Sequence, residues 1–563
     1  MTCRKSVPRA ASVAAPTAVT TLLCALAGAA AAADPPTDAF DAALAGIRPE
    51  AIRADMRFLA DDLLEGRRTG TRGHLLAAQF IASQFESMGL IPAGDHRSFF
   101  QDVPLQSVSV DEPASSFGWT NAAATESLKF REDYILYGDP GREDSQVTAP
   151  IVFVGYGITA PDQNYDDYKG ADVKGKIVAI VFGAPDFPSA VKAHYSASWL
   201  KRKNAAAHGA AGLLLFYEPR FESLYPFAKQ VRDLAVPRMN WLDAAGAPDH
   251  YYAALKAYGA VSMPAVRRLL SGSGHSAEEI SAGMKSGKLA AFPLPGSAEI
   301  RTVSRRALVH SPNVVAKLEG DDPKLSAEYV VYTAHLDHLG ISTPVNGDSI
   351  YNGALDNASG AAEVLEIARA FTRMPHKPRR SVLFIEVTGE EEGLLGSDYF
   401  ASNPTVPPAA IVADVNIDED LMLWPLRDVV ALGAEHSSLD AVVRRAADRL
   451  RLAVSPDPQP EQVGFVRSDQ YSFVRQGVPS FALTAGFKSD DPSLKPAKIS
   501  QNWEAHFYHQ PQDDMQQPGL NFDAAARFAQ VGFLCGVYVA QDNDRPRWNQ
   551  DDFFGTAFTG AKP

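Results

Sequence analysis

The spacing of apolar residues changes along the chain and predicts two kinds of segment in its first half. Residues 49–90 carry apolar side chains at helical intervals, and Gly89 is placed to end the last helix. Short apolar runs at residues 149–158 and 173–183 instead predict strands. Residues 201–217 predict a further helix followed by a strand. A helical start is therefore followed by a β-rich continuation.

In the second half of the chain, strand-like and helix-like segments alternate. Three apolar runs have the length of a buried strand, at residues 329–333, 382–387 and 410–417. Helical patterns cover residues 358–374 and 439–452. Because parallel strands are joined by helical crossovers, the alternation predicts an α/β fold with a mostly parallel sheet flanked by helices.

The length of 563 residues and the change of pattern predict more than one domain. The middle of the chain has no cluster of His, Asp and Glu comparable to the one in the second half, so we interpret it as an accessory domain. We predict a signal peptide at 1–33, the N-terminal part of the main domain at 34–130, an insert at 131–300, the main part of that domain at 301–545 and a polar tail at 546–563.

Residues 1–33 have the layout of a secretory signal peptide. Arg4, Lys5 and Arg9 precede an apolar, Ala-rich run that ends in three alanines before Asp34. The alternative is a membrane anchor, but the run of roughly 16 residues is shorter than the ~20 needed to span a bilayer. We therefore expect cleavage and export to the periplasm or the medium.

The positions of the three cysteines argue against a lipid anchor and against a disulfide. Cys24 lacks the small preceding residue of a lipoprotein signal, so we do not expect lipidation. Loss of residues 1–33 would leave Cys535 as the single cysteine, which excludes an intrachain disulfide.

The formal charge of −14 would become −17, with 50 basic against 67 acidic residues. This surface argues against nucleic acid or anionic lipid as the main partner, and no later stretch is long and apolar enough to span a membrane.

The stretch TAHLDHLG places two histidines and an aspartate directly after a predicted strand. Residues i and i+2 of an extended chain share a face, so His335 and Asp337 should point one way and His338 the other. A metal-bound imidazole usually donates its second N–H to a carboxylate. His335 could thus be a metal ligand and Asp337 its partner, or these residues could simply cap the strand.

Carboxylates follow the other predicted strands as well. Asp356 precedes an Ala-rich helix, where it could be a helix cap or a carboxylate that bridges two cations. The run 390–392 is three glutamates, either a solvated loop or a metal ligand beside a general base. Asp418 ends the next strand, and His509 follows a proline-containing loop. Since strand ends of a parallel sheet meet at one edge and buried carboxylates without cations are costly, we predict a shared cation site.

These motifs resemble the zinc-dependent aminopeptidase family typified by aminopeptidase Y and the small secreted bacterial leucyl aminopeptidases. They stand in the order of that family, and the similarity extends upstream to residues 58–73. The insert resembles a protease-associated domain. The motifs that carry the resemblance to the peptidases are AHLDHLG, GALDNASG, TGEEEGLLGS, VNIDED and YHQPQDD.

The resemblance implies a phosphorylase/hydrolase-like fold, a mixed and mostly parallel sheet flanked by helices, that holds two Zn²⁺ ions. By motif, Asp356 is similar to the bridging ligand, and Glu390 to the general base. Asp337 is similar to the partner of His335. The remaining ligands implied are His335 and Asp418 for one ion, and Glu391 and His509 for the other.

The implied activity is hydrolysis of the N-terminal peptide bond of peptides whose α-amine is free. Three alternatives stay open: another metal-dependent reaction of the carboxypeptidase or glutaminyl cyclase type, a non-catalytic receptor-like protein, and an insert that is mainly a binding module. The chain departs from the family at Asp418-Glu419, where Asp-Met is frequent. We expect Ser468 and Asp469 to form the wall of the pocket without a catalytic role.

Overall fold

The computed structural model describes residues 37–559, except residues 123–124, 235 and 288–289. The signal peptide predicted at residues 1–33, with Cys24, therefore lies outside the described residues. Within the described part of the chain, no helix combines the length and apolar character that a membrane crossing requires.

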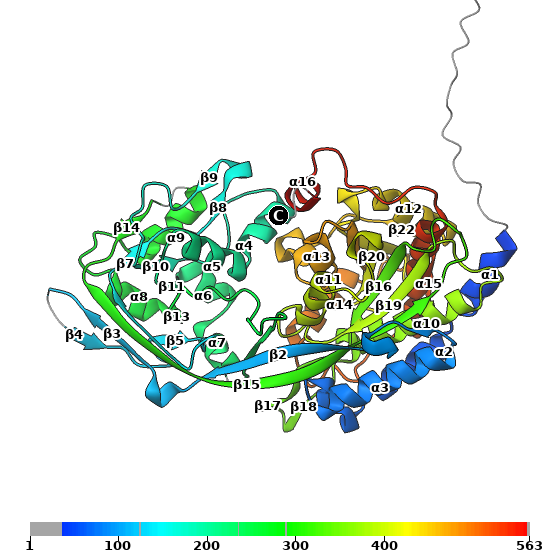
Figure 1. Cartoon of the computed structure of the whole chain (residues 1–563), viewed down its shortest axis with the longest axis horizontal. Helices are drawn as coiled ribbons and strands as arrows, with labels where there is room; N and C mark the ends of the chain where they lie inside the picture. The colour runs from blue at the N-terminus through cyan, green and yellow to red at the C-terminus, as the bar shows by residue number, and fades with distance from the viewer. Residues whose placement is uncertain (1–36, 123–124, 235, 288–289, 560–563) are drawn as a thin grey trace, which may run out of the picture.

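A 22-residue strand, β15 (Ser297–Leu318), runs through both halves of the molecule (Figure 1). Its first residues pair with β3 (Ser116–Thr120) and β6 (Asp144–Ala149) of the insert. Its later residues pair with β2 (Phe100–Val110) and β19 (Ser381–Val387) of the main domain. The two domains are therefore joined through continuous sheet rather than through a flexible linker.

The main domain is built on a large mixed sheet with four parallel central strands, which agrees with the predicted α/β class. The strands follow the order β12, β2, β15, β19, β16, β20, β23, β21, β22. The central four, β19 to β23 in this order, run parallel. Their neighbours β15 and β21 run antiparallel to them. The bounds are β12 (Arg238–Trp241), β16 (Tyr329–His335), β20 (Ile411–Ile417), β21 (Asp428–Leu432), β22 (Ala453–Val454) and β23 (Ser480–Ala485).

Helices cover both faces of this sheet, so its central strands are apolar on both sides. On β16, Val330 and Tyr332 face the larger core and Val331 faces the smaller one. Such a continuous apolar run is typical of buried parallel strands. The larger core is covered by α2 (Pro49–Leu59), α3 (Arg72–Ser87), α10 (Ser359–Thr372), α12 (Leu439–Arg449) and α15 (Phe522–Gln541). The smaller core is covered by α11 (Leu395–Ser402) and α13 (Gln470–Val474).

The insert has its own core around a second sheet, ordered β14, β7, β10, β11, β13, β5. Its strands are β5 (Tyr134–Leu136), β7 (Ile151–Phe153), β10 (Ile177–Ile180), β11 (Gly212–Phe216), β13 (Tyr258–Val261) and β14 (Phe292–Pro293). Its helices are α4 (Ser189–Ser196), α5 (Ser198–Ala207), α6 (Pro219–Leu224), α7 (Phe227–Asp233), α8 (Met263–Leu269) and α9 (Ala277–Ser286).

The insert begins earlier than the predicted boundary between residues 130 and 131. Phe117 and Trp119 of β3 are buried in the core of the insert, together with Tyr134 and Phe153. In the other direction, β12 lies inside the predicted insert but pairs with β2 of the main sheet. Strand β3 therefore belongs to the insert, because its aromatic side chains pack in the core of the insert.

The C-terminal segment is packed against both domains, which corrects the prediction of a polar tail. Helix α16 (Phe553–Thr559) buries Phe554 against Phe465 and Tyr471 of the main domain. The ring of Phe553 lies 5.5 Å from that of His194 in α4. Helix α16 thus lies beside α4 of the insert and α13 of the main domain, and its aromatic residues make the contacts (Figure 1).

Candidate metal centre

Donor side chains gather at the carboxyl ends of neighbouring parallel strands. β16 ends at His335, β20 ends directly before Asp418, and the turn after β19 carries Glu391. Strands that lie side by side in parallel end at the same edge, which places these three side chains together. Asp356 joins them from the loop before α10, and His509 from the turn that follows α14 (Pro496–His506).

The first group of donor atoms consists of His335, Asp356 and Asp418. His335 Nε2 lies 3.2 Å from Asp356 Oδ1 and 3.2 Å from Asp418 Oδ1. Ser468 donates a hydrogen bond to the other oxygen of Asp418 and accepts one of 2.7 Å from Asn416. Ser468 therefore fixes the orientation of Asp418, a contact beyond the predicted role as pocket wall.

The second group uses the other oxygen of Asp356. His509 Nε2 lies 3.2 Å from Asp356 Oδ2 and 3.2 Å from Glu391 Oε2. Asp356 thus offers one oxygen to each group. This is the arrangement expected of a carboxylate that bridges two cations.

The donor atoms fit zinc in type and in spacing. Zinc binds histidine nitrogen and carboxylate oxygen at about 2.0–2.2 Å in tetrahedral geometry, which separates the ligand atoms by about 3.3 Å. The four distances of 3.2 Å match this spacing. Asp356 Oδ2 and Glu391 Oε1 are buried without a hydrogen-bond partner. Cations would satisfy these oxygens, so the residues present fit the metal that the resemblance implies.

A third group of potential ligands lies where the insert meets the main domain and already has its cation. Asp249, His250 and Asp398 are close enough to share an ion. Arg475 Nη2, however, lies 2.7 Å from Asp398 Oδ1. Its guanidinium neutralises the group, which we therefore interpret as an interdomain ion pair.

Glu390 and Asp337 are adjacent to the donor groups, but the carboxylate of Asp337 contacts Glu390 and Thr69 rather than His335, the partner that the resemblance implied. The carboxylate of Asp337 accepts hydrogen bonds from the main-chain N–H of Glu390 at 3.1 Å and from Thr69 at 3.0 Å. The Nδ1 atom of His335 lies 3.0 Å from the main-chain carbonyl of Asp337. The partner of His335 is thus the backbone of Asp337, because the chain turns back after β16. Burial raises the pKa of Glu390 well above its ordinary value.

His338 was expected to point away from His335 but faces the same centre. It is fully buried, and its Nδ1 lies 2.6 Å from Glu391 Oε1. The alternation of side chains holds only within a strand, and β16 ends at His335. Three residues later the chain has already turned inward.

Arg67 is a further buried residue that sequence reasoning missed. Its guanidinium donates hydrogen bonds to the main-chain carbonyls of Leu336 at 2.9 Å, Asn352 at 2.6 Å and Gly353 at 3.0 Å, and also to that of Leu59. It joins α2 to the two loops that carry His338 and Asp356. Burial lowers the pKa of Arg67 to about 10. The Gly-rich stretch around it had indicated only a turn.

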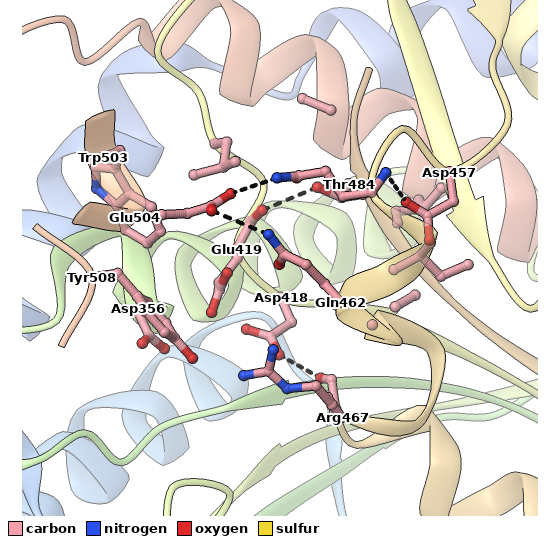
Figure 2. A pocket seen from close by; sticks show the side chains of 18 of the residues that line it. Asp356, Asp418, Glu419, Asp457, Gln462, Arg467, Thr484, Trp503, Glu504 and Tyr508 are labelled. Carbon is pink, nitrogen blue, oxygen red and sulfur yellow. Dashed lines mark hydrogen bonds between the residues drawn. The ribbon is translucent and has the colours of Figure 1, made fainter. Parts of the chain in front are cut away.

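A cavity of about 180 Å³ opens beside the donor groups. Figure 2 shows Glu419 directed toward the region between Asp356 and Asp418, with Arg467 drawn below Asp418. Burial and the neighbouring carboxylates of Asp356 and Asp418 raise the pKa of Glu419 well above its ordinary value. Among the described residues, none places a cationic side chain within 4.0 Å of Glu419. The wall of the cavity includes Leu421, Leu432, Phe487, Trp503, Gln459, Gln462 and Glu504.

Residues 313–533, which contain all the donor residues, match Peptidase family M28. This segment is similar to peptidase family M28. This confirms the resemblance to zinc-dependent aminopeptidases that the motifs had indicated. The N-terminal helices and the insert lie outside the matched segment, although α2 and α3 complete the larger core of the main domain.

Known proteins similar to this chain include a probable zinc metalloprotease and a leupeptin-inactivating enzyme. A probable zinc metalloprotease of Pyrenophora teres f. teres (strain 0-1) is 39% identical over 271 residues, which cover 42% of this chain and 53% of that protein. Leupeptin-inactivating enzyme 1 of Streptomyces exfoliatus is 26% identical over 197 residues, 34% of this chain and 39% of that protein. The chain thus spans about half or less of the curated relatives it matches.

The solved structure of an aminopeptidase from Aneurinibacillus sp. strain AM-1 has the same fold. It aligns over 91% of this chain and 99% of that protein, with a TM-score of 0.51 and 20% identity. The alignment reaches well beyond residues 313–533. It therefore includes the insert as well as the main domain.

Proposed function

We propose that the chain is an exported metallo-aminopeptidase that holds two zinc ions and removes N-terminal residues from peptides. The observation that carries the proposal is the pair of donor groups that share Asp356. Each has a histidine and two carboxylate oxygens at 3.2 Å spacing. Glu390 and a cavity border the same centre.

In this proposal His335, Asp356 and Asp418 hold one zinc ion, and Asp356, Glu391 and His509 hold the other. Bound zinc supplies Lewis acidity, which activates water and polarises the carbonyl of the scissile bond. Glu390 accepts the proton of the attacking water and passes it to the leaving amine.

The surroundings of Glu390 support its role as the base. Asp337 fixes its main chain through the hydrogen bond to the N–H, which leaves the carboxylate of Glu390 free to face the cavity. Burial favours the protonated form of this carboxyl, which favours the transfer of a proton from water to Glu390.

Recognition of a free α-amine is assigned to the acidic corner of the cavity. Glu419 lies beside Asp356 and Asp418 without a cationic partner within 4.0 Å among the residues that the structure describes. A substrate ammonium would neutralise this corner, and the apolar residues Leu421 and Phe487 would face the side chain of the first residue. Glu419 stands where the family frequently has Met, and this carboxylate would thus strengthen the preference for a free N-terminus.

Export rests on the pattern of residues 1–33, and peptides outside the cytoplasm would be the substrates. The insert, by its resemblance to protease-associated domains, would help to position longer peptides. The carboxypeptidase and glutaminyl cyclase types of reaction remain the alternatives on this fold, since a fold does not fix its chemistry.

The first test offers one peptide to the full chain with a free and with an acetylated N-terminus, with and without added zinc. We expect stepwise loss of single N-terminal residues from the free peptide only, and only with zinc, as followed by mass spectrometry. Shortening of the acetylated peptide from its C-terminus would instead support a carboxypeptidase. Cyclisation of an N-terminal glutamine would support the glutaminyl cyclase type.

Substitution of Glu419 tests the recognition of the amine. Glu419→Gln should lower kcat/KM for free peptides about 10- to 100-fold, because a hydrogen bond to a charged group contributes about 1.5–3 kcal/mol. The loss should appear mainly in KM, as measured by initial rates over a range of peptide concentration. Glu435→Gln removes a carboxylate that is largely exposed in the same domain and should have no effect. Equal kinetics of Glu419→Gln and the wild type would contradict the assignment.

A further inference from the structure

The cavity beside the donor groups has a second acidic region, which no step of the proposed reaction uses. Glu504 of α14 and Asp457 of the loop after β22 both line this cavity. Figure 2 draws these two carboxylates in its upper half and Asp356 and Asp418 in its lower half, with Glu419 between the two pairs. The wall of the cavity therefore carries negative charge that is separate from the donor groups.

Neutral donors hold the carboxylate of Glu504 in place. Its Oε1 accepts hydrogen bonds from Gln459 Nε2 at 3.1 Å and from Ser500 Oγ at 3.0 Å, and its Oε2 accepts one from Gln462 Nε2 at 3.1 Å. The two oxygens of a carboxylate offer about four acceptor positions, so one position on Oε2 is left. Amides and a hydroxyl orient the carboxylate, but they do not neutralise its charge.

In the part of the chain that the structure describes, no cationic side chain lies within salt-bridge distance of Glu504 or Asp457. Arg467 also lines the cavity, but Figure 2 draws it below Asp418, on the other side of Glu419. A substrate group that displaces water from Glu504 must therefore bring a compensating charge, because a carboxylate that loses its water without a partner is costly.

Apolar side chains line the same cavity. They belong to Leu421, Leu432, Phe487 and Trp503. Lysine and arginine lay their methylene stems along apolar surface and keep the charged head with polar partners. An apolar wall that also carries carboxylates is complementary to such a side chain. An acidic side chain would be repelled there, and a purely apolar one would leave Glu504 without a partner.

We propose that the cavity takes the side chain of an N-terminal lysine or arginine and that Glu504 pairs with its charge. This inference rests on the proposed aminopeptidase activity and names its preferred class of substrate. Since Glu419 is assigned to the α-amine, the side chain of the same residue enters the remainder of the cavity, whose wall includes Glu504. Asp457 adds a second negative charge to this wall.

Peptides that differ only in their first residue test the inference on the zinc-loaded full chain. Lysine is compared with norleucine, which has the same four-carbon stem without the ammonium group. We expect kcat/KM to be about 10- to 100-fold higher for the lysine peptide, the usual contribution of a hydrogen bond to a charged group. An arginine peptide should behave like the lysine peptide. A ratio of one or less in the wild type would overturn the inference.

Variants of the wall test whether the charge of Glu504 sets this ratio. Glu504→Gln keeps the size of the side chain and should lower the ratio of lysine to norleucine by about 10- to 100-fold. A partial loss of folded enzyme would lower both rates alike and leave the ratio as it is. Glu504→Asp keeps the charge on a shorter stem and should retain part of the preference. The exposed Glu435→Gln should have the ratio of the wild type.

Gln462→Met separates the charge of Glu504 from the position of the loop that it holds. This variant removes one hydrogen bond to Glu504 and keeps the carboxylate, so the ratio should stay close to that of the wild type. If Gln462→Met lowers the ratio as much as Glu504→Gln does, the position of the loop sets the preference and the inference is wrong.

The outcomes distinguish this inference from the function on which it rests. If none of the peptides loses its first residue, the proposed aminopeptidase activity fails and the inference fails with it. If all of them are shortened from the N-terminus without an advantage for lysine, only the inference fails. A preference for lysine that Glu504→Gln removes and Gln462→Met retains would support it.

Discussion

Replacement of Glu390 by glutamine should lower kcat by about 10²- to 10⁴-fold, the usual contribution of a general acid–base group. The amide cannot accept the proton of the attacking water. The substitution leaves the five proposed ligands untouched, and the hydrogen bond to Asp337 uses the main chain of Glu390. Zinc content and the free energy of unfolding should therefore stay close to those of the wild type.

The measurement combines steady-state rates on a free peptide with zinc content and a denaturation curve. Glu392→Gln provides the matched control, because it makes the same change two positions away, where the carboxylate pairs with Arg68 at 2.9 Å. That variant should keep most of the activity. A Glu390→Gln enzyme with a nearly normal rate would exclude Glu390 as the base.

The second large effect concerns stability and comes from Arg67. Arg67→Met should reduce the free energy of unfolding by about 3–5 kcal/mol, the range observed when one partner of a buried charged group is removed. Four main-chain carbonyls would lose their donor at once. The nearby carboxylates of Asp337, Asp356 and Asp513 would also lose a positive charge.

Urea denaturation of the zinc-free and zinc-loaded chains would measure this loss. Arg68→Met is the matched control, because Arg68 is partly exposed and pairs mainly with one carboxylate. Its effect should stay within about 1 kcal/mol, as is usual for pairs near the surface. Arg67→Lys keeps the charge but reaches fewer carbonyls. Its loss of free energy of unfolding should therefore lie between the losses of Arg67→Met and Arg68→Met. If Arg67→Met lowers the free energy of unfolding by less than about 1 kcal/mol, the hydrogen bonds of Arg67 do not hold α2 and the two loops together.

The motifs predicted the parts of the fold and of the centre that depend on regular structure. The runs at residues 329–333, 382–387 and 410–417 became β16, β19 and β20, since apolar runs of this length have few alternatives in a buried sheet. Because these strands are neighbours and parallel, the polar residues after them necessarily meet. The structure accordingly brings together His335, Asp356, Glu391, Asp418 and His509.

The features that sequence reasoning missed all lie where the chain leaves regular structure. Alternation gave the wrong direction for His338, because the strand ends three residues before it. The carboxylate of Asp337 accepts a hydrogen bond from the main chain of Glu390, whereas His335 contacts the main-chain carbonyl of Asp337. Arg67 donates to carbonyls nearly 300 positions away, such as that of Gly353. No local pattern could indicate those partners.

The long strand β15 and the insert before it also determine when the centre can exist during synthesis. Helices α2 and α3 emerge first, yet their partner α15 follows more than 400 residues later. At about 5–20 residues per second this delay is roughly 20–90 s. The core strands of the insert, from β3 to the first part of β15, are contiguous and can fold meanwhile. A nascent chain would therefore carry a finished insert but no complete set of the proposed zinc ligands until His509 emerges. A peptidase whose centre is completed last cannot cleave neighbouring chains while it is being made.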